Sequence, residues 1–268
     1  MAHTEKKSLG YADIAYLDTV GKQLQHLKQR SIEKMCLKPG DHVLDLGCGP
    51  ASDTISLAQV VGKTGKVVGI DCDNEMIKLA NQRAIDANVN DFVTHQVHMI
   101  HGSTKLPFED NTFDACRSER VFQHLVDPKN ALLELVRVTK PGGKIIIMDT
   151  DWGSIGHYTS FPEIESKIKL VYRDKISLNP LIARQIHSMM REANLKQIKA
   201  EPVIFASHDY KEFNYILGFH NKVKDEGMKC NYFTQEEYDK FVNDLIEINA
   251  KGDFLGYVCG FITIGEKI

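Results

Sequence analysis

The chain has 268 residues, of which 43% are hydrophobic and 26% are charged, and 33 basic against 36 acidic residues give a formal net charge of -3. This composition is that of an ordinary globular protein, long enough to bury a sizeable core. Proteins that bind nucleic acids usually carry a basic excess, because counterion release from phosphates supplies most of their affinity. The balanced charge therefore argues against a nucleic-acid partner.

Six single cysteines, at positions 36, 48, 72, 116, 230 and 259, form no CxxC pair. This spacing indicates neither a zinc site nor a redox pair, and reduced thiols are typical of a cytoplasmic protein. The N-terminal stretch lacks the apolar region of a signal peptide, and no run approaches the roughly 20 apolar residues of a membrane-spanning helix. We therefore expect a cytoplasmic protein without stable membrane insertion, and the sequence is compatible with a homodimer.

The first 40 residues predict a helical segment, with Leu17, Val20, Leu24 and Leu27 at helical spacing before Pro39-Gly40 ends the pattern. Strands and helices alternate from there to residue 150. The predicted strands cover 42–46, 66–71, about 97–101, 112–116 and 144–149, and the predicted helices cover 52–61, the stretch up to 87, and 128–138. Near-continuous apolar strands separated by helices predict a doubly wound α/β fold with a mostly parallel sheet.

The alternation weakens after Asp149, and residues 151–180 show little periodicity. The later predicted elements are helices over 181–193, 209–225 and 234–248 and strands over 198–206 and 254–264. We expect these segments to complete a seven-stranded sheet and to add helices that cover a ligand pocket. A core over 41–150, flanked by 1–40 and 151–268, would then form a single domain.

The most informative motif is the run VLDLGCGP over residues 43–50, in which a strand ends at Gly47 and Gly49. Glycines at such a turn let backbone approach a ligand, because they carry no Cβ. A dinucleotide fingerprint needs a third glycine where Ser52 stands, to seat a pyrophosphate at the helix N-terminus. Asp45 would also repel a pyrophosphate, whereas it suits a ligand that carries an ammonium and a sulfonium group.

Asp71 ends the next strand, 22 residues beyond Gly49. A carboxylate at this place can accept hydrogen bonds from ribose hydroxyls. A ligand with a ribose, a positive tail and no phosphate is S-adenosylmethionine. A purely structural alternative is that Asp45 and Asp71 only cap adjacent helices. Two functional alternatives also stay open: an NAD(P)-dependent oxidoreductase and a non-catalytic S-adenosylmethionine-binding protein.

The chain resembles the class I methyltransferases, and within them the ubiquinone/menaquinone C-methyltransferase-like group. The resemblance rests on DHVLDLGCGPASDTISLAQ, GKVVGIDCDNEMIKLANQRA, KLPFEDNTFDAC and LLELVRVTKPGGKIIIMD, which together span about 42–150. It implies a Rossmann-like fold in which the backbone of Gly47, Cys48 and Gly49 faces the amino-acid part of the cofactor. It further implies that Asp71 holds the ribose and that Cys72 and Met76 flank the adenine.

One position departs from the family, which often has an acidic residue after the glycine that precedes the LPF segment. Here the run is Gly102-Ser103-Thr104. The adenine amino group would therefore meet the Ser103 hydroxyl or the backbone of this run. The resemblance also suggests that the backbone of Arg117 contacts the methionine end of the cofactor.

The methyl acceptor should lie beyond the carboxyl ends of the fourth and fifth strands, where ligands of open α/β sheets bind. Methyl transfer is an in-line displacement that needs mainly positioning, and a general base only where the acceptor loses a proton. His124, His157 and Glu119 are the candidates for that base. Trp152, the single tryptophan, either forms a wall of the pocket or belongs to the core.

A metal site is not expected, because His95, His98 and His101 would project to alternating faces of a strand. The run Cys116-Arg117-Ser118-Glu119 also lacks the Asn/Asp-Pro-Pro-Tyr/Phe element that clamps an extruded amino group in N-methyltransferases of nucleic acids and glutamine. We therefore predict a small-molecule acceptor, such as a quinone precursor or a secondary metabolite. Methylation at carbon, oxygen or nitrogen stays open.

Overall fold

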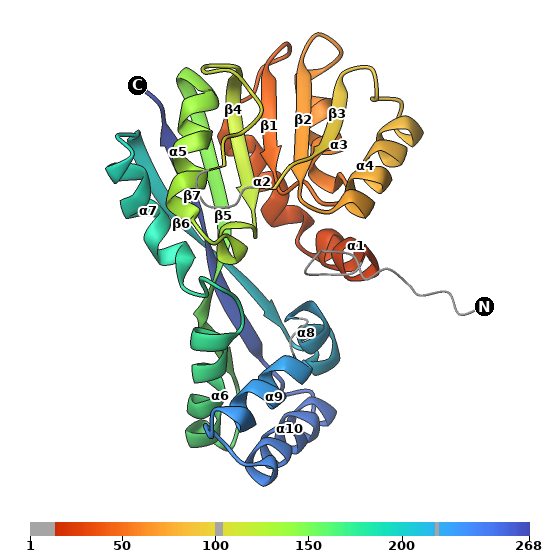
Figure 1. The fold of residues 1–268 in the computed structure, drawn as a ribbon. Coiled ribbons are helices and arrows are strands. Elements are labelled where there is room, and N and C mark those ends of the chain that lie inside the picture. Colours follow the sequence, from red (N-terminus) through yellow and green to blue (C-terminus); the bar gives the residue numbers. More distant parts are fainter. Residues whose placement is uncertain (1–13, 100–103, 218–219) are drawn as a thin grey trace, which may run out of the picture.

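The computed structural model describes residues 14–99, 104–217 and 220–268. Seven strands form one sheet in the order β3-β2-β1-β4-β5-β7-β6 (Figure 1). All neighbouring strands are parallel except β7, which runs antiparallel to both β5 and β6. The predicted Rossmann-like, mostly parallel seven-stranded sheet is confirmed.

The strands and helices of the structure have the following residue bounds. The strands are β1 (His42–Leu46), β2 (Lys66–Asp71), β3 (Val93–Val97), β4 (Phe113–Glu119), β5 (Thr139–His157), β6 (Lys196–Ser207) and β7 (Gly256–Glu266). The helices of the described residues are α1 (Ile14–Gln23), α2 (Gln25–Met35), α3 (Ser52–Val61), α4 (Asn74–Asp86), the short η1 (Phe122–His124), α5 (Pro128–Val138), α6 (Pro162–Lys175), α7 (Ile182–Glu192), α8 (Tyr210–Leu217), α9 (His220–Lys229) and α10 (Gln235–Ala250).

Helices cover both faces of the sheet, because its central strands are apolar on both sides. Leu44 and Leu46 of β1 pack into a cluster that α5 and α7 close, whereas Val43 packs into a cluster with α2, α3 and α4. The helix signals are local and clear. For example, α5 begins with Pro128, and its N-cap residue Asp127 accepts a hydrogen bond from the Asn130 amide at 3.0 Å.

A third apolar cluster lies in a lower lobe, into which β5, β6 and β7 extend below the parallel part of the sheet (Figure 1). It joins Trp152 and Ile155 of β5 to apolar side chains of α6, α8, α9 and α10. The expected helical cover is thus present as a second packed body attached to the ends of three strands. Among the described residues, no helix combines the length and the apolar character needed to cross a membrane.

Several elements differ from the sequence-based expectation: β4 runs on to Glu119 instead of ending at residue 116, and α8 and α9 replace one helix expected over 209–225. Strand β3 lies four residues earlier than predicted, because it pairs with β2 from Val93 to Val97 and ends where β2 ends. Strand β5 does not end at residue 149 but continues to His157, where β7 pairs with it after an irregularity. Helix α6 was not predicted, although Ile164, Ile168 and Val171 recur at helical spacing and are buried.

Candidate active site

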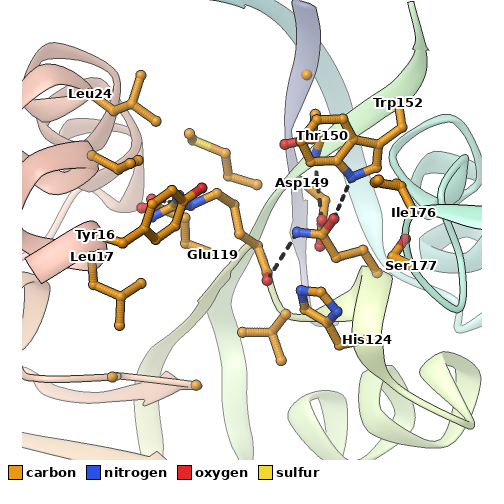
Figure 2. Close-up of a pocket in the computed structure, with 18 of the residues that line it drawn as sticks. Tyr16, Leu17, Leu24, Glu119, His124, Asp149, Thr150, Trp152, Ile176 and Ser177 are labelled. Carbon is orange, nitrogen blue, oxygen red and sulfur yellow. Dashed lines mark hydrogen bonds and ion pairs between the residues drawn. The ribbon is translucent and has the colours of Figure 1, made fainter. Parts of the chain in front are cut away.

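A cavity of about 1260 Å³ opens at the carboxyl ends of β1, β2 and β4, beside the point where the parallel part of β5 ends. Helices α1 and α2 form one of its walls, and the lower lobe forms the opposite wall. Figure 2 shows Tyr16, Leu17 and Leu24 on one side of this space and Trp152 and Ile176 on the other. The location is the one at which open α/β sheets bind ligands.

The glycine loop after β1 forms part of the wall, with Gly47, Cys48 and Gly49 all facing the cavity. Gly47 has φ +77°, and a Cβ atom there would lie 2.1 Å from Cγ2 of Val121. Gly49 has φ +50°, and a Cβ atom there would meet nothing within 4 Å. The loop therefore exposes bare backbone to open space, as binding of a ligand against the main chain requires.

Asp71 lies beside this loop at the end of β2 and lines the cavity. Its carboxylate accepts hydrogen bonds from the amides of Gly49 and Asp73, each at 2.9 Å. A carboxylate has about four acceptor positions, so others remain for a ligand. Cys72 and Met76 continue the same wall, while the predicted contacts Gly102 and Ser103 lie outside the described residues.

Asp45 and Arg117 were expected to meet the ligand, but the structure places both outside the lining of the cavity. Their side chains are 3% and 1% exposed, and neither lines the cavity. The main chain of Arg117 is paired on both sides, opposite Asp45 of β1 and Ile146 of β5. Both residues lie behind the cavity wall, so neither is placed to touch a ligand in the cavity.

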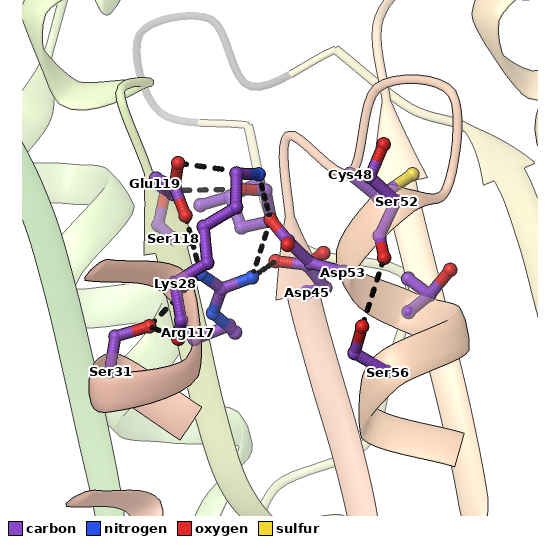
Figure 3. Close-up of polar contacts among 12 residues, drawn as sticks. Lys28, Ser31, Asp45, Cys48, Ser52, Asp53, Ser56, Arg117, Ser118 and Glu119 are labelled. Carbon is purple, nitrogen blue, oxygen red and sulfur yellow. Dashed lines mark hydrogen bonds and ion pairs between the residues drawn. The ribbon is translucent and has the colours of Figure 1, made fainter. Parts of the chain in front are cut away.

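Arg117 instead organises a buried ion-pair network (Figure 3). Its guanidinium lies 2.9 Å from Oδ2 of Asp53, 2.7 Å from Oε2 of Glu119 and 3.7 Å from Oδ1 of Asp45. Burial tends to raise the pKa of Asp53, but the charges of Arg117 and Lys28 outweigh it and hold that pKa below its ordinary value. Burial also raises the pKa of Asp45, which the more distant Arg117 only partly offsets.

Lys28 and Asp53 belong to the cavity wall and were missed by the sequence analysis. Nζ of Lys28 lies 2.8 Å from Oδ2 of Asp53 and 3.4 Å from Oε1 of Glu119. The wall therefore presents one ammonium group beside two carboxylates. The available signal was weak: Lys28 follows the apolar position Leu27, and nothing local shows that α2 packs over the glycine loop.

Of the three candidate bases, His124 and Glu119 line the cavity and His157 does not. Burial, then the charges of Lys222 and Arg120, lower the pKa of His124 to about 4, so its imidazole is neutral at neutral pH. Both carboxylate oxygens of Glu119 face cations, with Arg117 at 2.7 Å and Lys28 at 3.4 Å. The carboxylate of Glu119 is therefore already engaged in ion pairs within the protein.

His157, the third candidate, lies in the lower lobe and away from the cavity. Its Nδ1 lies 3.3 Å from Oε1 of Glu165, and its ring meets the rings of Phe213 and Phe241 edge-on. It lines only a separate space of about 30 Å³. This position makes His157 part of the lower-lobe core.

Trp152 fulfils both roles that the sequence left open. Its ring lines the cavity and also stacks on Tyr172 in the lower-lobe cluster, with ring centroids 6.0 Å apart. Its Nε1 donates a hydrogen bond to Oε1 of Gln123 at 2.5 Å. Through this bond, the lower lobe is tied to η1 at the cavity wall.

His95 and His98, the two histidines of the run that the structure describes, lie in different surroundings. His95 hydrogen-bonds to Thr54 and Asn81, His98 faces the cavity, and His101 lies outside the described residues. Within the described ranges, no group of three or more His, Cys, Asp or Glu side chains could hold a metal ion.

Comparison with known proteins decides the family. A family model described as a methyltransferase domain matches residues 37–235. The chain belongs to this methyltransferase family. The predicted class I S-adenosylmethionine-dependent methyltransferase is thereby confirmed, with S-adenosylmethionine as its cofactor, and the match argues against the oxidoreductase alternative.

Two relatives in sequence illustrate the match of this methyltransferase. A demethylmenaquinone methyltransferase of Bacillus cereus is 40% identical over 124 residues, which are 46% of this chain and 50% of that protein. An uncharacterized 37.1 kDa protein in transposon TN4556 of Streptomyces fradiae is 27% identical over 260 residues, which are 95% of this chain and 71% of the relative. The chain thus spans half the length of the demethylmenaquinone methyltransferases that it matches.

Solved structures share the fold of this methyltransferase. YcgJ of Bacillus subtilis superposes with a TM-score of 0.64 at 21% identity, covering 91% of this chain and 98% of that one. Phosphoethanolamine N-methyltransferase 2 of Haemonchus contortus, in complex with S-adenosyl-L-methionine, superposes with a TM-score of 0.55 at 19% identity, covering 94% and 56% of the two chains. At these identities the likeness shows the fold alone.

Proposed function

We propose that this methyltransferase methylates a small aromatic molecule that carries a ring hydroxyl group, such as a quinol. The single observation that carries the proposal is the size and continuity of the cavity. Its volume of about 1260 Å³ exceeds the roughly 300–1,000 Å³ of pockets that hold one drug-sized ligand, so it has room for a cofactor and an acceptor together. The name of the demethylmenaquinone methyltransferases, half of whose length this chain matches, supports a quinone-type acceptor.

The cavity wall near the glycine loop fits the cofactor. We propose that the backbone of Gly47, Cys48 and Gly49 meets its amino-acid part, where Gly49 leaves open space. An α-amino acid carries one positive and one negative charge, and Lys28 and Glu119 present the complementary pair on this wall. Oε1 of Glu119 lies 3.4 Å from both Nζ of Lys28 and Nε of Arg120 but accepts no hydrogen bond among the described residues, so it could accept one from an ammonium group.

The ribose and adenine positions follow from the same wall. The remaining acceptor positions of Asp71 would hold ribose hydroxyls, and Cys72 and Met76 would flank the adenine. When bound, S-adenosylmethionine supplies a methyl group on a sulfonium sulfur for in-line displacement. The protein contributes chiefly by holding the methyl donor and the acceptor in position, which can lower the activation free energy by roughly 7–11 kcal/mol.

The acceptor would occupy the part of the cavity between His124 and the lower lobe. Trp152, Phe205 and Leu217 give this part an apolar and aromatic wall. An aromatic ring buried there gains free energy from the loss of water contact and from ring packing. The excluded water also protects the methyl donor from side reactions.

Binding of S-adenosylhomocysteine tests the cofactor half of the proposal. We expect the thermal unfolding temperature of the protein to rise with S-adenosylhomocysteine and not with NADH, since only a ligand of the native state stabilises it. Asp71→Ala should weaken the affinity for S-adenosylhomocysteine at least tenfold, while Asp86→Ala, at an exposed position of α4, should leave it unchanged. Near-normal affinity of the Asp71 variant would refute the ribose contact.

The reaction is tested by incubating the protein with S-adenosylmethionine and naphthalene-1,4-diol under argon. We expect formation of S-adenosylhomocysteine together with a singly methylated naphthalene product, both measured by mass spectrometry. An enzyme that binds S-adenosylhomocysteine tightly but transfers no methyl group to this diol would contradict the proposed acceptor class.

A further inference from the structure

Asp149 is a buried carboxylate where the parallel part of β5 ends, one residue beyond the pairing of Met148 with Glu119. It is 1% exposed and lines the cavity, next to Thr150 and Trp152 (Figure 2). Oδ1 accepts a 3.2 Å hydrogen bond from the Thr150 amide, the backbone amides of Gln123 and Phe122 also act on the carboxylate, and Oδ2 has no partner that meets the geometric limits of a hydrogen bond among the described residues. Buried polar atoms are nearly always paired, so an unpaired carboxylate oxygen on a cavity wall indicates a ligand that donates to it.

The charges around Asp149 favour a neutral donor. Apart from the wall near the glycine loop, with Lys28, Asp53 and Asp71, the charged and titratable groups that line the cavity include Tyr16 on α1, Glu119 on β4, Arg120 after it, His124 on η1, Lys175 at the end of α6 and Lys222 on α9. Three of these are fixed cations, which disfavour a cationic amine in the same space. The aromatic and apolar side chains of the acceptor region instead favour a ring, and a ring hydroxyl is the neutral donor that such a molecule carries.

Asp149 is also better suited than His124 to receive a proton. Burial raises the pKa of Asp149 to about 7, although the amides of Thr150 and Gln123 partly offset the effect. Burial lowers the pKa of His124 to about 4, which makes it a weak base. General bases work best when their pKa lies near the working pH.

We propose that Asp149 accepts a hydrogen bond, and then the proton, from a ring hydroxyl group of the methyl acceptor. This inference rests on the proposed function and names the residue that activates the acceptor. The O–H bond breaks, its proton goes to Oδ2 of Asp149, and its electron pair stays on the ring as an aryloxide. The aryloxide oxygen or its ortho carbon bonds to the methyl carbon while the carbon–sulfur bond breaks and leaves its electron pair on sulfur. Where carbon is methylated, its hydrogen then leaves to solvent as a proton.

Binding of two ring probes to the S-adenosylhomocysteine complex tests the hydrogen bond. We expect wild type to bind 1-naphthol at least tenfold more tightly than naphthalene, which lacks the hydroxyl. Asp149→Leu, which keeps the size of the side chain, should lose this preference. Asp151→Asn is the matched control: Asp151 is a buried aspartate on the same strand, but it pairs with Arg184 at 2.8 Å and does not line the cavity, so the preference should persist.

Turnover of naphthalene-1,4-diol tests the proton transfer. We expect Asp149→Asn to lower kcat/KM between 10²- and 10⁴-fold, the usual contribution of a general base. In wild type, kcat/KM should rise with pH through about 7, as the Asp149 carboxyl loses its proton, and the variant should lack this limb. The affinity of each variant for S-adenosylhomocysteine shows whether the cofactor-binding part of its cavity is intact.

The outcomes separate the inference from the proposed function. Normal binding of S-adenosylhomocysteine with no preference for 1-naphthol, or a kcat/KM of Asp149→Asn within threefold of wild type, would overturn the role of Asp149 alone. A wild-type protein that binds no S-adenosylhomocysteine would overturn both. A preference for 1-naphthol that depends on Asp149, without any methyl transfer, would support the hydrogen bond and overturn the proposed reaction.

Discussion

At the scale of single residues, Gly47 joins the backbone of the cofactor loop to the packing behind it. Its φ of +77° already disfavours any side chain, and the Cγ2 atom of Val121 fills the space that a Cβ atom would need. Gly142 has nearly the same φ, +79°, but nothing lies within 4 Å of a Cβ atom built there. The two glycines therefore separate the cost of the backbone conformation from the cost of a clash.

We predict that Gly47→Ala lowers the free energy of unfolding more than Gly142→Ala does. The left-handed conformation alone costs an alanine about 1–2 kcal/mol, and overpacking against Val121 adds about 1–3 kcal/mol. Gly47→Ala should also weaken S-adenosylhomocysteine binding at least tenfold, whereas Gly142→Ala should not. Urea unfolding and calorimetry measure the two effects. The double variant Gly47→Ala/Val121→Ala should recover part of the stability, and equal losses for both single variants would refute the clash.

His95 makes a prediction about pH, because burial lowers its pKa from 6.5 to about 4. The unfolded chain takes up this proton as the pH falls below about 6.5, whereas the native state resists until about 4, so His95 stabilises the fold less at acid pH. Between pH 6.5 and pH 4, this effect lowers the free energy of unfolding by up to about 3 kcal/mol. The cost of His95→Gln, measured by urea unfolding, should therefore be smaller at pH 4.5 than at pH 7.5. A cost that does not change with pH would contradict this account.

The residues of the site were predictable to different degrees. Gly47, Gly49 and Asp71 follow from local pattern, because each stands at the end of a predicted strand. The prediction that Asp45 meets the ligand did not take account of Arg117, because nothing in the local sequence shows that Arg117 on the neighbouring strand lies opposite Asp45. Lys28 and Asp149 depend on which elements close over the loop and on side-chain direction, and neither property is local.

At the scale of elements, the buried ion-pair network holds the cofactor loop against the sheet. Arg117 on β4 contacts Asp53 on α3, while Lys28 on α2 contacts the same carboxylate. Removing one partner of a buried network is costly, because the remaining charges stay buried without compensation. The network thus couples three elements that the sequence separates by almost 90 residues.

We predict that Arg117→Met lowers the free energy of unfolding by about 3–5 kcal/mol at pH 7. The cost should shrink at pH 5, because without the guanidinium the buried carboxyls of Asp45 and Asp53 take up protons more easily. Lys129→Met is the control: its pair with Glu192 is 69% and 57% exposed, and such pairs contribute less than about 1 kcal/mol. Urea unfolding at both pH values measures the difference. Similar small decreases in the free energy of unfolding for both variants would show that Arg117 does not stabilise the fold through the buried network.

The elements themselves were predictable where their patterns are local. Helix α5 has a capping aspartate, a proline start and a clear apolar face, and its predicted bounds match. The length of β5 was not predictable, because its lower half is held by β7, more than 90 residues away in sequence. The apolar face of α6 was present in the sequence, but the weak periodicity around it concealed the helix.

At the scale of the whole molecule, the cavity is closed by contacts between parts that are distant in sequence. Helix α1 meets α8 across it: the Tyr16 hydroxyl donates to the carbonyl of Ile216 at 2.7 Å, and Nε2 of Gln23 donates to Glu212 at 2.8 Å. The rings of Tyr16 and Tyr215 also lie 6.1 Å apart. The N-terminal segment therefore connects the upper sheet to the lower lobe over the ligand space.

We predict that Tyr16→Phe loosens this closure without unfolding the protein. One hydrogen bond contributes about 1 kcal/mol net, so the exchange of amide hydrogens in α1 and α8 should accelerate about fivefold. Exchange in α10, which does not line the cavity, should stay unchanged.

Tyr215→Phe is the matched control, because it removes a tyrosine hydroxyl from the exposed face of α8, where the side chain is 46% exposed, and leaves the bond from Tyr16 in place. Hydrogen exchange with mass spectrometry resolves these segments. Equal acceleration in α10 would mean that the substitution weakens the lower lobe as a whole, and no acceleration in α1 would mean that the bond does not hold the cavity closed.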